Sequence, residues 1–477
     1  MSNERPVRAL LSLLISVLVL GVVGPIARAQ PLPNQAPASA IDAVAMVLAA
    51  ASNPRWTGQR VPRPDPTPRP VGASIVVRSA LRPVAVHADP SAARVRLAEE
   101  ALAALEAAHD LMRATGWSLP VSDGERGDTA GFDLYLVDLE HGAYETRADG
   151  DLPLSFEDSS AAYAVVDPDV DSTLFAACVT QAYVDASLLG TDPAEAPQWR
   201  RATSAWLAWM ITGRFGCDED EVGRAMAEPW RAPIPDRSAH EGAEGGTDDG
   251  QPLDGAGGAA WLALLDAYHG GGTGNFVREA WQFARQRTWE GHDLRGSPDL
   301  FQVLRAMFPN DAEKLEDVVE ALALSRWLAD TPAAPSHALR ALPQLGVPAA
   351  KGPLAWDSLP RRMRFDDTPI RSFGTGYVVV DTRGAAPHSN LRVWLRGEYG
   401  TTWSLVGARM DAGGHVLSQL STPPRRLPRS YVVIELLEAT DHVLLAVTNL
   451  APRLPDADSI DVNERGFELL VDRGVGP

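Results

Sequence analysis

The chain changes character near Ala333, and this change limits the folds that it can adopt. Before this point apolar residues recur mostly at helical spacing, whereas after it short alternating segments are separated by Pro and Gly. With 477 residues, 45% of them hydrophobic, the chain can bury more than one core. We therefore predict an α+β protein, with a mixed-sheet and helical domain over residues 73–332 and an all-β sandwich domain over residues 345–477.

Five short alternating segments support the predicted sandwich. They are Gly376–Val380, Leu391–Leu395, Thr402–Val406, Tyr431–Leu436 and Val443–Val447. Regularly spaced strands of this kind are typical of antiparallel sandwiches. Four prolines between residues 329 and 351 predict a linker that separates the two domains.

The beginning of the chain has the pattern of a secretory signal peptide. Arg5 and Arg8 precede an apolar stretch over residues 9–24, and Ala27-Arg28-Ala29 forms a small-residue cleavage site. Because this stretch is shorter than the roughly 20 residues that span a bilayer, we predict removal of residues 1–29 and export to the periplasm or the cell exterior. An uncleaved membrane anchor is the alternative. Residues 30–72, rich in Pro, Ala and Arg, predict an extended linker, and no later stretch predicts a transmembrane segment.

The charge of the chain excludes some partners. The sequence holds 62 acidic and 43 basic residues, which gives a formal net charge of -19. This excess of negative charge argues against nucleic acid and anionic membrane surfaces as partners.

Cys178 and Cys217 are the two cysteines of the chain. An exported protein with an even number of cysteines usually oxidises them, so we predict one disulfide between them. It would close a loop of about 40 residues and stabilise the fold by roughly 4 kcal/mol at most. Two free buried thiols, or a nucleophilic cysteine, are the alternatives.

Residues 73–330 predict a series of elements that resembles the gluzincin metallopeptidases. The order is strand, long helix, strand, edge strand, a helix over Ser172–Leu189 at the H-E-x-x-H position, a second helix over Pro197–Gly213 and a helical subdomain. Tyr163–Asp167 before the first of these two helices and Ala202–Trp206 in the second carry the resemblance. It implies a metallopeptidase-like fold with an appended sandwich, as in secreted bacterial members of that group.

The residues that zinc chemistry needs are missing from the corresponding positions. The first ligand and the general base fall on Thr180 and Gln181, and the second ligand falls on Val184. No Glu occurs between Ala196 and Asp218 to supply a third ligand. Zinc needs imidazole, thiolate or carboxylate ligands, and the attacking water needs a base, so we predict no metal and no cofactor.

Other motifs give weaker indications of a site. The dipeptide His240-Glu241 falls in a Gly-rich loop, where a metal pair need not converge. The acidic segment Asp167–Asp171 lacks two residues of a calcium loop and is better explained as a helix-capping turn. A second acidic segment, Asp456–Asn463, is interpreted as a surface loop, and Gly270–Gly274 lacks the Walker lysine and predicts a helix connection.

The sequence thus favours an exported, non-catalytic, metallopeptidase-like protein that binds a peptide, a protein or an envelope component. Two other functions remain open. One is a secreted hydrolase with an unrecognised carboxylate or Cys-His site, and the other is a structural or surface assembly protein. The metal content distinguishes the first of these alternatives most directly.

Overall fold

The computed structural model describes most of the chain after residue 65. The described residues are 60–61, 66–124, 126–127, 131–149, 159–231, 255–285, 294–295, 300, 303–304, 307, 312–328, 348–399, 401–422, 429–450 and 465–474. The predicted signal peptide, most of both predicted linkers, His240-Glu241 and Asp456–Asn463 lie outside them.

A five-stranded sheet in the order β2-β3-β4-β6-β5 begins the described part of the fold. Its strands are β2 (Ile75–Arg78), β3 (Val84–Ala88), β4 (Phe132–Leu136), β5 (Tyr144–Ala148) and β6 (Ala162–Val166). The three inner strands are parallel, whereas β2 and β5 pair antiparallel at the two edges. The inner strands are buried on both faces, which explains why they are almost wholly apolar.

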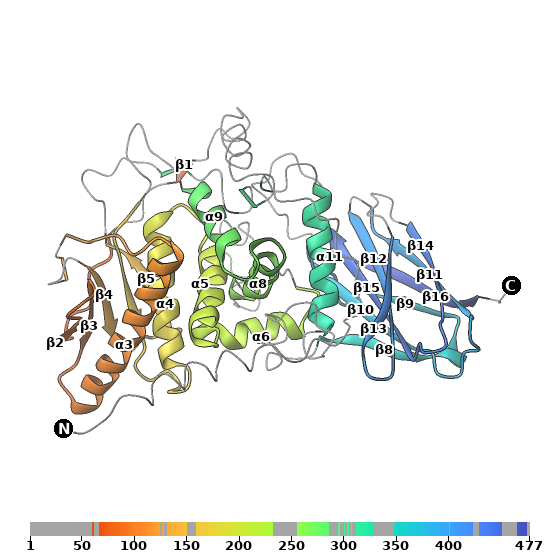
Figure 1. Ribbon diagram of the computed structural model, residues 1–477, viewed down its shortest axis with the longest axis horizontal. Helices are drawn as coiled ribbons and strands as arrows, with labels where there is room; N and C mark the ends of the chain where they lie inside the picture. Colours follow the sequence, from red (N-terminus) through yellow and green to blue (C-terminus); the bar gives the residue numbers. More distant parts are fainter. Residues whose placement is uncertain are drawn as a thin grey trace, which may run out of the picture. The chain divides into compact units, whose positions relative to one another are not determined.

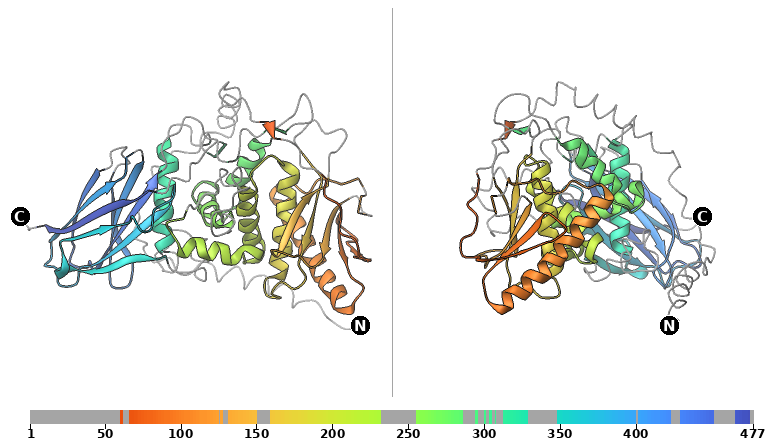
Figure 2. Two further views of the ribbon diagram at one scale, coloured as in Figure 1. Left: turned by 180° about the vertical axis from the view of Figure 1, so that it is seen from behind. Right: turned by 60° about the vertical axis from the view of Figure 1, so that its left-hand side comes forward.

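Helices α3 (Ala92–Thr115) and α4 (Phe175–Thr191) pack on one face of this sheet (Figures 1 and 2). The side chain of Ser91 accepts a hydrogen bond from the backbone of Arg94 and caps the N-terminus of α3. Gly116 ends the helix in the left-handed region, with φ of 75°.

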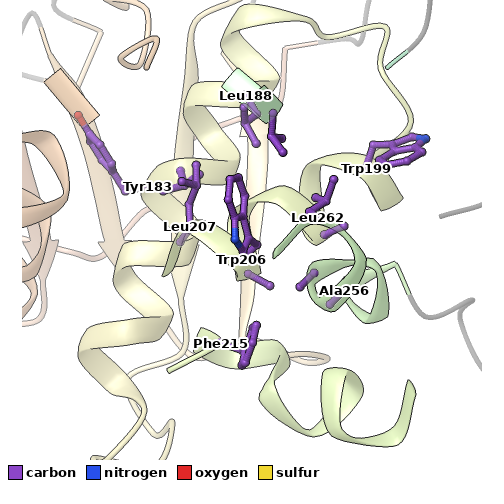
Figure 3. Packing of buried hydrophobic residues seen from close by; sticks show 14 of the residues in the cluster. Tyr183, Leu188, Trp199, Trp206, Leu207, Phe215, Ala256 and Leu262 are labelled. Carbon is purple, nitrogen blue, oxygen red and sulfur yellow. The ribbon is translucent and has the colours of Figure 1, made fainter. Parts of the chain in front are cut away.

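Further helices extend this core away from the sheet. They are α5 (Pro197–Thr212), η1 (Gly216–Asp218), α6 (Glu219–Ala227), η2 (Ala256–Gly258), α8 (Ala259–Leu265), η3 (Asp266–Gly270) and α9 (Asn275–Ala284). Trp206 of α5 lies among Leu207, Phe215 and Leu262, and all four side chains are buried (Figure 3). The two short strands β1 (Arg60–Val61) and β7 (Leu294–Arg295) pair antiparallel.

The C-terminal part is rich in β-structure, as predicted, and forms two sheets that share a core. The strands are β8 (Ala350–Ala355), β9 (Arg361–Arg364), β10 (Thr375–Asp381), β11 (Asn390–Gly397), β12 (Thr402–Met410), β13 (Val416–Ser421), β14 (Arg429–Glu435), β15 (His442–Leu450) and β16 (Phe467–Gly474), with a short η4 (Trp356–Ser358) after β8. The sheet orders are β13-β12-β15-β10-β8 and β14-β11-β16-β9. The pair β8–β10 is parallel, so the prediction of a purely antiparallel sandwich is wrong at this edge.

Helix α11 (Ala312–Leu328) covers the outer face of the larger of these two sheets. Leu324 and Leu328 pack with Tyr377 and Leu444 in a cluster separate from the sandwich core. The hydroxyl of Tyr377 donates a hydrogen bond to the carbonyl of Ala323. This helix therefore buries its apolar side against the β-rich part of the chain.

Among the described helices, none combines the length and the apolar character that crossing a bilayer requires.

Candidate functional site

The predicted helix over Ser172–Leu189 is present as α4, and the side chains of Thr180 and Val184 point into the protein core. Thr180 is fully buried, and its hydroxyl donates to the carbonyl of Ala176 at 2.9 Å. Val184 is also fully buried, in the core that α3 and α4 share. The polar side of the helix is formed instead by Gln181 and Asp185, one turn apart.

Gln181 and Asp185 both face the edge strand β5. The amide of Gln181 donates to the hydroxyl of Tyr144 at 3.2 Å. The hydroxyl of Thr146 donates to Asp185 Oδ2 at 2.6 Å. Tyr144 and Thr146 are two residues apart on one strand, so both side chains are on the same face of the sheet.

Two arginines of α5 neutralise the carboxylates of this cluster. Arg200 Nε lies 3.4 Å from Asp185 Oδ1, and Arg201 Nη2 lies 2.8 Å from Asp218 Oδ1. Gln181 Nε2 donates to the second oxygen of Asp218 at 2.5 Å. We call the residues Tyr144, Thr146, Gln181, Asp185, Arg200, Arg201 and Asp218 the polar cluster.

Burial changes the ionisation of two groups in the polar cluster. It raises the pKa of Asp218 above the usual carboxyl value, although Arg201 and Gln181 oppose the rise. Burial also raises the pKa of Tyr144 well above its ordinary value, and the charges of Asp185 and Asp218 add to this rise. The Tyr144 hydroxyl therefore remains protonated at neutral pH and serves as a hydrogen-bonding group.

The predicted disulfide between Cys178 and Cys217 is confirmed, and it holds Asp218 in place. It joins α4 to η1, with 4.6 Å between the two Cα atoms. Gly216 has a φ of 74°, and a Cβ atom there would lie 2.4 Å from Gln181 Oε1, so only glycine allows η1 to approach α4 this closely. Although Asp218 opens an acidic run in the sequence, its side chain is only 7% exposed and is bonded to Gln181 of α4.

The polar cluster lacks the groups of a hydrolytic metal centre. None of the seven residues of the polar cluster is a histidine or a cysteine, and each of its carboxylates is paired with a guanidinium. The two buried histidines of this sheet and its helices bond elsewhere: His109 to the hydroxyl of Tyr183 at 2.9 Å, and His87 to Asp133 at 2.9 Å. The polar cluster is therefore a buried network whose hydrogen bonds and ion pairs are made within the protein, and it lies beside the edge strand β5.

The acidic segment Asp167–Asp171 behaves as a turn. Asp167 and Asp171 accept hydrogen bonds from the backbone of Asp169 and Thr173. Oxygens of Asp138, Asp167 and Asp169 lie close enough together to surround a cation. However, the guanidinium of Arg94 lies 3.1 Å from Asp138 and 3.3 Å from Asp169, so positive charge is already supplied there.

A second polar cluster covers the sheet face opposite α3 and α4. Arg69, from the predicted linker, pairs with Asp133 at 2.6 Å and Asp149 at 2.7 Å and also with Asp123. Its guanidinium lies over the ring of Tyr163. Residues 66–70, which we call the strap, are thereby attached to the sheet.

The strap also meets one end of the edge strand. The backbone N–H of Thr67 donates to the carbonyl of Ala148 at 3.1 Å. The N–H of the next residue, Asp149, points the other way, toward β6, and donates to the carbonyl of Ala161. Since these directions alternate along an antiparallel strand, the N–H and C=O groups of Tyr144 and Thr146 point away from β6. Within the described residues no backbone group bonds to them.

Comparisons with known proteins do not place this chain in a family. No family model matches it, and no curated protein matches it. Among solved structures, part of the chain is similar to part of the insecticidal delta-endotoxin Cry8Ea1 from Bacillus thuringiensis, with 14% sequence identity and a TM-score of 0.14. The match covers 22% of this chain and 19% of the toxin chain, and it carries no conclusion about fold or function.

Proposed function

We propose that the protein is an exported, non-catalytic binding protein that holds an extended peptide along the outer edge of β5. The observation that carries this proposal is the position of the polar cluster beside an antiparallel edge strand whose outward backbone groups have no described partner. A peptide added to such an edge gains main-chain hydrogen bonds, and neighbouring side chains select its sequence.

The charge state of the polar cluster supports binding rather than hydrolysis. A general base must accept a proton near neutral pH, and a metal ligand must offer a free lone pair. Asp185 is held by Arg200 and Thr146, and Asp218 by Arg201 and Gln181, so each oxygen of both carboxylates already has a partner within the protein. The confirmed disulfide is consistent with export, because disulfides persist in oxidising compartments.

The edge can be tested by removing one backbone donor. The N–H of Thr146 points away from β6, so Thr146→Pro removes this donor while leaving the ladder to β6 intact. We expect T146P to abolish the binding of extended peptides on an immobilised decapeptide array. Thr146→Val is the matched control, because it keeps the N–H and removes only the hydroxyl that bonds to Asp185.

Two results would reject the proposal. One is that T146P and T146V bind the same peptides equally well. The other is that the wild-type protein, starting at Gln30, binds no peptide on the array.

A further inference from the structure

The smaller sandwich sheet carries two transverse rows of side chains on its outer face. Its strands β14, β11, β16 and β9 pair in a register that sets Tyr431, Trp394, Leu470 and Arg362 side by side. The next row, two residues along each strand, consists of Arg429, Arg396, Glu468 and Arg364. The intervening residues Leu395 and Leu469 point into the sandwich core and are buried.

The second row concentrates positive charge on a chain with a net charge of -19. Glu468 pairs with both Arg362 and Arg364, at 3.5 Å and 3.2 Å. Arg396 and Arg429 are direct cross-strand neighbours, and in the part of the chain that the structure describes neither forms an ion pair. Like charges placed opposite one another destabilise a sheet, so an anion that binds both arginines would relieve a cost already present in the fold.

The first row supplies two adjacent aromatic rings. The rings of Trp394 and Tyr431 have centroids 5.0 Å apart and are inclined by 34°. Tyr431 is 48% exposed although it is a large aromatic residue. Trp394, Tyr431, Arg362, Arg396, Arg429 and Glu468 line one hollow of about 630 Å³.

We propose that this face binds an anionic polysaccharide whose sugars carry carboxylates. Sugar rings present apolar C–H faces, which pack on aromatic rings, and this face offers the exposed ring of Tyr431 beside the half-buried ring of Trp394. Arg396 and Arg429 donate charge-assisted, bidentate hydrogen bonds to the carboxylates. Glu468 accepts hydrogen bonds from sugar hydroxyls, and phosphodiester groups have no such donor.

The same features disfavour nucleic acid as the occupant. Aromatic rings also stack with bases, and arginines pair with phosphates. However, a deoxyribose-phosphate backbone has no hydroxyl groups along its length that could donate to Glu468, which lies beside Arg396 on this face. A polyuronate carries hydroxyl groups beside each carboxylate, so it suits a face on which arginines and one carboxylate form a row next to two aromatic rings. This inference does not depend on the peptide proposed at β5.

The test uses polygalacturonate as the probe and the chain from Gln30. Affinity electrophoresis should show binding to polygalacturonate and none to neutral dextran. The double variant Arg396→Gln/Arg429→Gln should weaken binding about tenfold or more, because it removes two charge-assisted contacts. Arg383→Gln is the control, since Arg383 is an exposed sandwich arginine outside the hollow, and it should bind as the wild type does.

The melting temperature distinguishes a lost site from a lost fold. The double variant should melt no lower than the wild type, because it removes a repulsion between neighbours. The inference is overturned if polygalacturonate does not bind or if the double variant and the control bind it equally. Tighter binding of oligothymidylate than of polygalacturonate, lost in the double variant, would assign the face to single-stranded nucleic acid instead.

Discussion

Asp133 lies between two basic groups on the sheet face that the strap covers. Its carboxylate accepts hydrogen bonds from Arg69 at 2.6 Å and bonds to His87 at 2.9 Å, and its side chain is fully buried. Burial alone would raise the pKa of Asp133, but the hydrogen bonds from His87 and Arg69 outweigh burial and lower the pKa below 3.8. The ionised form is therefore favoured by folding.

This shift predicts a pH-dependent effect of Asp133→Asn. A carboxyl group whose pKa is lower in the folded than in the unfolded state contributes stability above pH 3.8, and this contribution is lost as the pH falls below that value. At pH 7 we expect D133N to lower the free energy of unfolding by about 3 kcal/mol, since it leaves Arg69 with a broken buried pair. Urea unfolding at several pH values from 2 to 7 measures the free energy of unfolding of both proteins. The difference between D133N and the wild type should shrink below pH 3.8.

Asp138→Asn provides the matched control, because the Asp138 side chain is 79% exposed. Its effect should stay within about 0.5 kcal/mol at every pH. If D133N lowers the free energy of unfolding by the same amount from pH 7 to pH 2, folding does not lower the pKa of Asp133, and this prediction is wrong.

At the scale of elements, α11 is a structural part of the β-rich region. Leu324 and Leu328 are 9% and 5% exposed, and they pack on the sheet that contains β10 and β15. Glu320 accepts a hydrogen bond from the hydroxyl of Ser421 at 3.0 Å and another from Ser404. Without the helix, an apolar sheet face would be exposed to water.

A fragment that begins at Ala312 should therefore be more stable than one that begins at Leu345, the start of the predicted sandwich domain. We expect the longer fragment to melt cooperatively and remain monomeric. The shorter one should melt lower and associate, because the face around Tyr377 and Leu444 is uncovered. Thermal melts by circular dichroism and sedimentation measure both properties. Equal melting temperatures would show that α11 does not stabilise the sandwich.

The sequence predicted long elements better than short ones. The helices α4 and α5 agree with prediction to within a few residues, because their apolar spacing extends over several turns. The sequence does not locate strand β5, because the residues of Tyr144–Ala148 are mostly polar and show no clear apolar alternation. In the polar cluster, the sequence singles out Gln181 only as a motif position without a catalytic base, and it gives no indication of Asp185, which the fold brings against Thr146 of β5. Arg201 and Asp218 join the cluster through the packing of α5 and the disulfide, which no local pattern encodes.

At the scale of the whole molecule, the composition of the polar cluster predicts the metal content. The chain from Gln30 should hold no stoichiometric zinc after dialysis and show no chelator-sensitive peptidase activity. The reason is that Thr180 and Val184 are buried in the core and the polar face of α4 carries an amide and a paired carboxylate. Elemental analysis by mass spectrometry measures the metal, with a zinc peptidase dialysed in parallel as the control. One zinc per chain would contradict this view of the site.

The position of β16 in its sheet affects how the chain folds while it is being synthesised. This strand lies between β11 and β9, although β12 to β15 are made before it. Until Phe467–Gly474 has emerged from the ribosome or an export channel, β9 and β11 each present an open edge that can pair with other nascent chains. A message with a stop codon before residue 467 would thus produce a protein that aggregates or requires a chaperone, even though the rest of the sandwich is complete.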